Sequence, residues 1–327
     1  MSEANSQRAL VALLKKVCQR RGIQVTSFSD DWLFCLQKDD QVSYIFGYDF
    51  GVNNASAKMI CKDKAATSDL LGFHKVPRIE HRIFHGPQLA GFVTEAGGWE
   101  EMLAYLAAHP QGVVCKPNEG TGGNAVYFVN TAHDLETAVY QVFAKSRSLC
   151  LSPFEDFEHE YRVALLDGKI EFVYRKVRPS VRGDGKRSIR DLFLSELAKA
   201  ADFSKEIAGM RKVGEMDLDW SRVPASGETV KLNWRHNLGQ GAKAEMLTPK
   251  QPEAKAATKL ALAAAKALGV KLASVDIAAT PEGLKVLEIN SGIMMESLVK
   301  IHPKGQSMAA RFYDRIICMA MDIERDQ

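Results

Sequence analysis

The spacing of apolar residues predicts alternating helices and short strands along most of the 327-residue chain. Helical spacing recurs in residues 4–21, 54–72, 99–109, 134–146, 189–200, 253–268 and 307–324. Short apolar or alternating runs typical of strands occupy residues 23–28, 32–37, 42–48, 78–84, 113–116, 125–129, 149–152, 160–166, 169–177, 230–234, 271–278 and 284–289. A helix break is expected near Asp63, and Gly22 and Gly269 are expected to end the helices before them. The pattern indicates the α/β (α+β) class.

Turn-forming residues divide the predicted elements into three units. Residues 1–76 form a short N-terminal α/β lead-in, residues 77–152 a compact α/β unit with its own sheet, and residues 153–327 a C-terminal unit. The apolar strand at 149–152 ends at a proline, and we interpret it as a hinge between the last two units. Residues 201–228 show little periodicity and are expected to be irregular.

Composition and charge narrow the class of protein. Apolar residues make up 46% and charged residues 25%, which is ordinary for a soluble globular protein. The net charge of +3 gives no general electrostatic case for nucleic acid or an anionic membrane. No apolar run is long enough to span a bilayer, and the N-terminus has no apolar signal core. Six scattered cysteines without a Cys-x-x-Cys pair indicate a reduced, cytoplasmic protein with neither disulfides nor a zinc site.

A glycine-rich loop between two strands is the first candidate for chemistry. Gly120, Gly122 and Gly123 follow the strand that ends at Lys116. Glycines let the backbone approach a bound group closely, and successive N–H groups in such a loop can cradle phosphate oxygens. Lys116 adds a mobile positive charge for the same phosphates. The alternative is an ordinary hairpin with a flexible loop, because a glycine loop alone is a weak signal.

A late hairpin carries the second candidate site. Asp276 lies within an apolar strand, while Glu288 and Asn290 share a face near the end of the next strand. Two carboxylates and an amide oxygen form a hard oxygen cluster suited to one or two Mg²⁺ ions held together with substrate phosphates. The alternative is that these carboxylates pair with lysines or arginines on an exposed face.

Five stretches, in this order, resemble the ATP-grasp fold, and above all the ATP-grasp domain of cyanophycin synthetase and of the bifunctional glutathione synthetases. They are Ile60-Cys61-Lys62-Asp63-Lys64 with Thr67 and Leu70-Leu71, Cys115-Lys116-Pro117 with the glycine loop, Glu160-Tyr161-Arg162, Gly183-Asp184-Gly185-Lys186, and Glu288-Ile289-Asn290. The resemblance covers roughly residues 42–305. It implies an ATP-grasp fold in which two α/β units clasp ATP, with residues 77–152 as the lid unit and residues 153–327 carrying the Mg²⁺ site.

The resemblance also implies a set of site residues. The ATP-binding residues would be Lys64, Lys116, Gly120, Thr121, Gly122, Gly123, Leu149, Cys150, Leu151, Ser152 and Glu160. Catalytic roles would fall to Arg162, Lys176 and Asn237, and Mg²⁺ ligation, with Mn²⁺ as a substitute, to Asp276, Glu288 and Asn290. In this set the lysines contact phosphates, the backbone at 149–152 contacts adenine, Glu160 holds the ribose hydroxyls, and Asn237 helps to hold an acyl phosphate.

The function implied is an ADP-forming ligase that joins a carboxylate to an amine through an acyl phosphate. Its substrates would be amino acids or small peptides, with no nucleic-acid or membrane partner, and a homo-oligomer is left open. Two alternatives remain: an ATP-grasp kinase with a hydroxyl acceptor, and an ATP-binding regulator without turnover. The chain departs from the family after Asn290, where Ser291-Gly292 replaces the common Pro-Gly pair, so substrate identity cannot be copied across.

Overall fold

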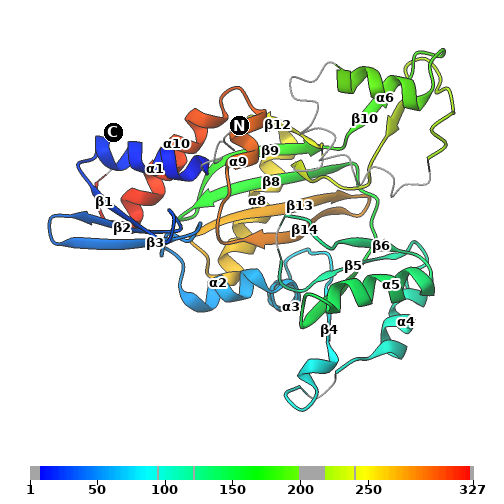
Figure 1. Cartoon of the computed structure of the whole chain (residues 1–327), viewed down its shortest axis with the longest axis horizontal. Coiled ribbons are helices and arrows are strands. Elements are labelled where there is room, and N and C mark those ends of the chain that lie inside the picture. Colours follow the sequence, from blue (N-terminus) through cyan, green and yellow to red (C-terminus); the bar gives the residue numbers. More distant parts are fainter. Residues whose placement is uncertain (1–7, 94–95, 121, 199–217, 239–240, 325–327) are drawn as a thin grey trace.

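The computed structural model of the protein describes residues 8–93, 96–120, 122–198, 218–238 and 241–324. An N-terminal unit lies at one end, a five-stranded sheet forms the middle, and two lobes project from the other end (Figure 1). All six cysteines are free thiols. Within the described ranges, no helix has both the length and the apolar character needed to cross a membrane.

The N-terminal unit is a three-stranded antiparallel sheet packed against the first and last helices of the chain. Its elements are α1 (Ala9–Arg20), β1 (Gln24–Phe28), β2 (Leu33–Lys38), β3 (Gln41–Phe46) and α10 (Gly305–Ala320), with strand order β1-β2-β3. Leu10 and Leu14 of α1 share one buried cluster with Phe34 of β2 and Phe312 of α10. The two ends of the described chain are therefore joined by a common core.

Two consecutive helices follow, α2 (Ala55–Lys62) and α3 (Lys64–Phe73), and the break predicted near Asp63 is confirmed. Asp63 has an extended backbone, and its carboxylate accepts a hydrogen bond from the backbone N–H of Ala66 at 2.8 Å. Asn54 caps α2 in the same way through the N–H of Ala57. Short polar side chains at these positions satisfy N–H groups that have no partner inside the helix.

The lower lobe in Figure 1 is a four-stranded sheet with helices on one side. It contains β4 (Arg82–His85), a short 3-10 helix (Pro87–Leu89), α4 (Trp99–Ala107), β5 (Val113–Pro117), β6 (Tyr127–Val129), α5 (Ala132–Phe143) and β7 (Ser148–Pro153), with strand order β4-β7-β5-β6. Thr131 caps α5, and its hydroxyl oxygen accepts a hydrogen bond from the backbone N–H of Asp134. Leu135 and Val142 of α5 pack on Val113 and Leu149 of the sheet and close this core.

The middle of the molecule is a five-stranded antiparallel sheet with order β12-β9-β8-β13-β14. Its strands and covering helices are β8 (His159–Leu166), β9 (Lys169–Val177), β12 (Lys243–Leu247), α8 (Pro252–Leu268), β13 (Leu272–Thr280), β14 (Gly283–Asn290) and α9 (Glu296–Ile301). The alanine-rich face of α8, together with α2 and α3, covers one face of the sheet. Gly269 ends α8 in the left-handed conformation, at φ 65°.

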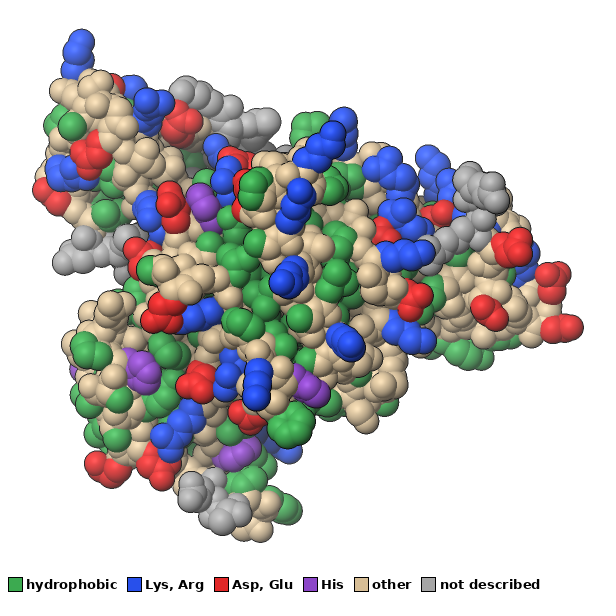
Figure 2. Space-filling model, turned by 180° about the vertical axis from the view of Figure 1, so that it is seen from behind, with side chains coloured by type: hydrophobic (Ala, Val, Ile, Leu, Met, Phe, Trp, Pro, Cys, Tyr) green, Lys and Arg blue, Asp and Glu red, His purple; other side chains and the backbone are tan. Residues whose placement is uncertain are grey.

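The upper lobe holds β10 (Ser180–Arg182), β11 (Thr229–Lys231) and α6 (Ile189–Ala198) around Val181, Ile189 and Val230. Seen from behind, both lobes lie on the left, and basic and acidic side chains are both present on the visible face, with mostly basic ones over its centre (Figure 2).

Several predicted boundaries were wrong, and each error has a local cause. The strand expected at 78–84 begins only at Arg82, because residues 77–79 instead hydrogen-bond to Val286 of β14. The strand expected at 230–234 ends at Lys231, and β10, β12 and α9 were not predicted. Most of the irregular stretch expected at 201–228 lies outside the described residues.

Truncation of Leu14 tests the shared core of the first and last helices. Leu14 is fully buried against α10, so Leu14→Ala should lower the free energy of unfolding by about 2–5 kcal/mol. Leu194→Ala is the matched control, because Leu194 is 50% exposed and the same change should cost less than about 1 kcal/mol. Urea denaturation gives both values, and equal losses would contradict this packing.

Candidate active site

One cavity of about 330 Å³ lies between the four-stranded and five-stranded sheets. Its wall combines the end of β5, the glycine loop, the chain after β7, the charged ends of β8, β9, β13 and β14, and residues 234–238. Of the predicted site residues, it brings together Lys64, Lys116, Gly120, Gly122, Gly123, Ser152, Glu160, Arg162, Lys176, Asn237, Asp276, Glu288 and Asn290. Thr121 lies outside the described residues.

The glycine loop is held by side chains from other parts of the chain. The Lys64 ammonium donates to the carbonyl oxygen of Gly120 at 3.0 Å, and the Asn237 amide donates to that of Gly122 at 2.9 Å. Asn237 reaches the loop from the opposite wall of the cavity. The loop is thus tied to both walls, and the side chain predicted to hold an acyl phosphate also fixes the loop.

The start of α3 is tied to the same loop. The backbone N–H groups of Lys64 and Ala65 donate to the carbonyl and side-chain oxygens of Asn118, at 3.2 and 3.1 Å. Asn118 is buried and directly precedes the glycine loop. The first N–H groups of α3 are thus occupied by Asn118 and Asp63, and the positive charge in this corner comes from the ammonium of Lys64.

Lys116 brings a second ammonium into this corner from β5. Its side chain is buried, and burial lowers the pKa of Lys116 below its ordinary value, with a further contribution from Lys64. The two lysines repel each other, and Glu288 and Glu160 nearby offset part of that repulsion. Phosphate oxygens would relieve that repulsion.

Four charged side chains, three of them buried and Arg162 partly buried, join three strands at the floor of the cavity. The Asp276 carboxylate accepts two hydrogen bonds from Arg162, at 2.7 and 2.5 Å, and lies 3.1 Å from the Lys176 ammonium. Lys176 also pairs with Glu160. Burial opposes ionisation of Asp276, but the two cations outweigh it and hold its pKa at about 2. Burial raises the pKa of Glu160, which shares Lys176 with Asp276.

This network bears on both readings of the late hairpin. Asp276 does pair with basic side chains, but in a buried site rather than on an exposed face. Glu288 lies directly opposite Asp276 in the strand pairing, and no described side chain donates a hydrogen bond to its carboxylate. Glu288 and Asn290 therefore offer open oxygen donors of the kind Mg²⁺ prefers, while Asp276 already accepts from two cations.

Only the last of the four predicted hinge residues reaches the cavity. Leu149, Cys150 and Leu151 are fully buried, and β7 is paired at these positions with both β4 and β5. Ser152 is paired only with β5, because β4 begins at Arg82 opposite Leu151. The open backbone edge therefore begins three positions later than the sequence suggested, at Ser152 and the residues after it.

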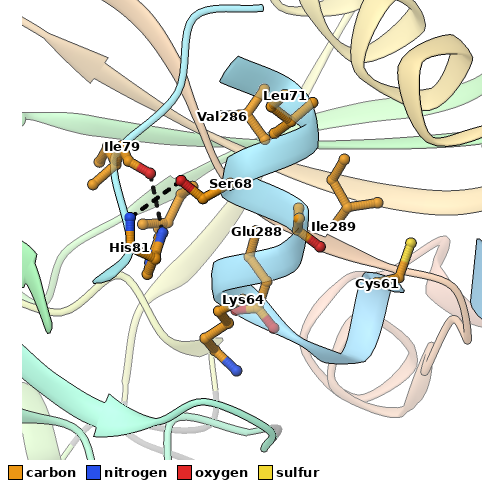
Figure 3. A pocket seen from close by; sticks show the side chains of 11 residues that line it. Cys61, Lys64, Ser68, Leu71, Ile79, His81, Val286, Glu288 and Ile289 are labelled. Carbon is orange, nitrogen blue, oxygen red and sulfur yellow. Dashed lines mark hydrogen bonds between the residues drawn. The ribbon is translucent and has the colours of Figure 1, made fainter. Parts of the chain in front are cut away.

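The late start of β4, at Arg82, has a visible cause in a small pocket between α3 and β14 (Figure 3). The backbone N–H of His81 turns away from β7 and donates to the Ser68 hydroxyl at 3.1 Å. The His81 ring donates from Nδ1 to the carbonyl of Ile79 at 3.0 Å. Burial, with the nearby Lys116 and Lys64, lowers the pKa of His81 well below its ordinary value, so the ring is neutral.

Sequence reasoning missed an aromatic and basic wall that faces the hinge. Trp234 contacts Phe154, with ring centres 5.8 Å apart, and His236 stacks on Phe157 at 4.8 Å. Arg235 is buried, lies over the Trp234 ring at 4.9 Å and donates to the carbonyl of Val126 beside the glycine loop. The only sequence signal for this wall was the run Trp234-Arg235-His236, which begins at the last residue of the strand expected at 230–234.

Replacement of Lys176 tests the buried charge network. Lys176→Met removes the cation shared by Glu160 and Asp276, so it should lower the free energy of unfolding by about 3 kcal/mol at pH 7.5. The pKa of Glu160 then rises further above its unfolded value. Because the folded variant takes up a proton as the pH falls, the deficit should shrink toward pH 5.

The matched control is Arg175→Met, on the same strand. Arg175 forms a partly exposed ion pair with Glu245 at 2.5 Å on the face of the sheet opposite the cavity, and its loss should cost about 0–1 kcal/mol at either pH. Denaturant titrations of both variants and of wild type at pH 5.5 and 7.5 give the loss in free energy of unfolding for each variant at each pH. A pH-independent deficit in Lys176→Met would argue against a charged Glu160 beneath the cavity.

Replacement of Asn237 tests the tie to the glycine loop. Asn237→Ala frees the Gly122 carbonyl, so peptides spanning residues 117–127 should exchange amide hydrogen about fivefold faster, without a change in β8. Asn124→Ala is the control, since the Asn124 side chain has no hydrogen-bond partner within the described ranges. Equal exchange in both variants would remove Asn237 as an anchor.

Comparison with protein families gives a direct match in the C-terminal part of the chain. The family described as RimK-like ATP-grasp domain matches residues 221–311. The glutathione biosynthesis bifunctional protein of Listeria welshimeri is 25% identical over 178 residues, which are 50% of this chain and 23% of that protein. Its counterpart in Listeria monocytogenes is 23% identical over 255 residues, which are 74% of this chain and 31% of that protein. The chain thus spans about a quarter to a third of the length of these relatives.

Solved structures agree with this assignment. A bifunctional glutathione synthetase from Pasteurella multocida has a TM-score of 0.53 and 19% identity, covering 94% of this chain and 44% of that one. A D-alanine–D-alanine ligase from Bacillus anthracis has a TM-score of 0.52 and 15% identity, covering 83% and 69%. At these identities the likeness shows the fold. The resemblance seen in the motifs is confirmed, and the chain has the ATP-grasp fold, with a RimK-like ATP-grasp domain matched in its C-terminal part.

Proposed function

We propose that this protein is an ATP-dependent carboxylate–amine ligase that forms an amide bond and releases ADP and phosphate. One observation carries the proposal. A single cavity collects two buried lysines and a glycine loop on one side, and the oxygen cluster of β13 and β14 on the other. Phosphoryl transfer needs little covalent chemistry from a protein and depends on such positioning and charge neutralisation.

In this proposal the three sequence units have separate tasks. Residues 77–152 act as the lid over ATP, residues 153–327 supply the reacting end of the site, and residues 1–76 are the lead-in. Lys64 and Lys116 bind nucleotide phosphates beneath the glycine loop. The base lies against the open backbone at Ser152, between Val114 and Leu287, which both line the cavity.

The proposed reaction has two steps. A carboxylate oxygen of the first substrate attacks the γ-phosphorus, the bond from that phosphorus to the bridging oxygen breaks, and ADP leaves. An amine then attacks the carbonyl carbon of the acyl phosphate, the carbon–oxygen bond to phosphate breaks, and the amine loses a proton. Arg162 and Lys176 face the phosphoryl group, where negative charge develops, and Asn237 supplies an amide donor.

Glu288 and Asn290 are the residues that would hold Mg²⁺, with Asp276 as a third ligand. The ion supplies neutralisation of phosphate charge when it is bound. For Asp276 to join, it would give up part of its contact with Arg162, which would then be free to turn toward the phosphoryl group. The closed glycine loop keeps water from the acyl phosphate.

The substrate class rests on the relatives. Their names describe a glutathione synthetase and a D-alanine–D-alanine ligase, so we propose an amino acid or a small peptide as carboxylate donor. The segment after Asn290 contributes Gly292 and Met294 to the cavity and differs from the family pattern. We therefore expect the acceptor substrate to differ from those of the relatives.

The proposal is tested by measuring ADP and free phosphate released from Mg·ATP over a panel of amino acids and dipeptides, with hydroxylamine as the trapping amine. Equal amounts of ADP, phosphate and hydroxamate are expected with the correct donor. Lys116→Met should lower the rate by at least about 100-fold, because it removes a buried cation from the phosphate corner. Lys259→Met, on the exposed side of α8, is the control and should leave the rate unchanged.

Other outcomes would point elsewhere. ADP with a phosphorylated product and no free phosphate would make the protein a kinase. ATP binding by wild type that Lys116→Met abolishes, with no turnover on any substrate of the panel, would favour an ATP-binding regulator.

A further inference from the structure

The outer face of the N-terminal sheet is uncharged, and its large side chains are exposed among the described residues. In the pairing of β1, β2 and β3, nine side chains point away from α1 and α10 in three rows of three. These nine residues, the outer grid, are Gln24, Gln37 and Val42; Thr26, Cys35 and Tyr44; and Phe28, Leu33 and Phe46. The inner face, with Phe34, Leu36 and Ile45, packs on the helices and is fully buried.

Large side chains of the grid are strongly exposed. Phe28 is 49%, Val42 50%, Tyr44 62% and Phe46 58% exposed, and Trp32 beside them is 44% exposed with its ring edge against Phe46. At about 150–250 Å² for a whole aromatic side chain, these residues present on the order of 500 Å² per molecule. A patch of this size on a soluble protein usually marks an interaction site.

The grid carries no charge at all. Charged residues make up 25% of the chain, so about two would be expected among nine surface positions. Solvent-facing strands, edge strands above all, normally carry lysine or other charges that prevent pairing with another chain. Here β1 and β3 are both edges of a three-stranded sheet, and neither places a charge on this face. The surface is therefore built for contact with another apolar surface.

We propose that the outer grid is the interface of a homodimer, in which the grids of two copies pack face to face about a two-fold axis. In such a contact each patch meets its own copy, so a patch of one sign would repel itself, whereas an uncharged patch does not. Two grids together bury on the order of 1,000 Å² before any rim is added, which reaches the lower limit of stable interfaces. This association is independent of the proposed ligase activity.

The outer grid also contains a free thiol that can report whether this face is covered. Cys35 lies in its middle row on the central strand, and it is the only one of the six cysteines that is not buried. Face-to-face packing places Cys35 near the two-fold axis. Its thiol is therefore covered in the dimer and open in the monomer.

Sedimentation equilibrium of the full chain tests the interface. Wild type is expected at twice the chain mass at micromolar concentration, while Tyr44→Lys with Phe46→Lys is expected at the chain mass. Two lysines facing their own copies without a partner should raise the dissociation constant at least about 100-fold. Tyr140→Lys with Phe73→Lys is the matched control, because these side chains are 69% and 79% exposed on α5 and α3.

Wild type at the chain mass, or a grid variant that stays dimeric, would overturn the proposal. Alkylation of Cys35 gives a second reading that does not depend on these lysine variants. Its rate with a maleimide should fall at least about tenfold as wild type is concentrated through the dissociation constant. A rate that does not change with concentration would contradict burial of this face, and Cys35→Ser identifies the reacting thiol.

Discussion

The buried ion network of Asp276, Arg162, Lys176 and Glu160 is the constraint on which the site depends. Two acids and two bases on three adjacent strands cancel in net charge, so they can be buried together, whereas removal of one leaves an uncompensated charge. The pairing also fixes strand register, because each partner lies directly across the ladder from the other. The charges that would face phosphate in the proposed reaction thus neutralise one another beneath the cavity.

One face of the five-stranded sheet packs in the hydrophobic core at one end of its strands and lines the candidate site at the other end. Along β8, Leu166 and Ala164 pack in the N-terminal core, and Arg162 and Glu160 then line the cavity. β13 makes the same change from Leu272 to Asp276. The N-terminal unit and α10 cover the apolar half and leave the charged half open to ligand. One face of the sheet therefore contributes both to the hydrophobic core and to the cavity, and the boundary between the two parts crosses the strands.

Much of the candidate site could be read from local sequence. Asp276 within an apolar strand and Lys116 before the glycine loop both carry their signal in their immediate neighbours, and the cavity contains them. β12 could not be read in this way, since it is an edge strand that pairs with β9 some 70 positions earlier in the chain. Arg235 was hidden for a similar reason. Its partner Val126, which follows the glycine loop, becomes a neighbour only when the two sheets face each other.

The late start of β4, at Arg82, has a consequence for how nucleotide preference could change by mutation. If the nucleobase binds at Ser152, it would contact main chain that lacks a β4 partner, because the N–H of His81 bonds to Ser68 of α3 instead. Point substitutions there should seldom convert one nucleotide preference into another. A lengthening of β4 by two residues would extend the ladder over the edge and abolish the subsite. Selectivity of this kind would depend on the length of β4, a strand remote from the reacting atoms.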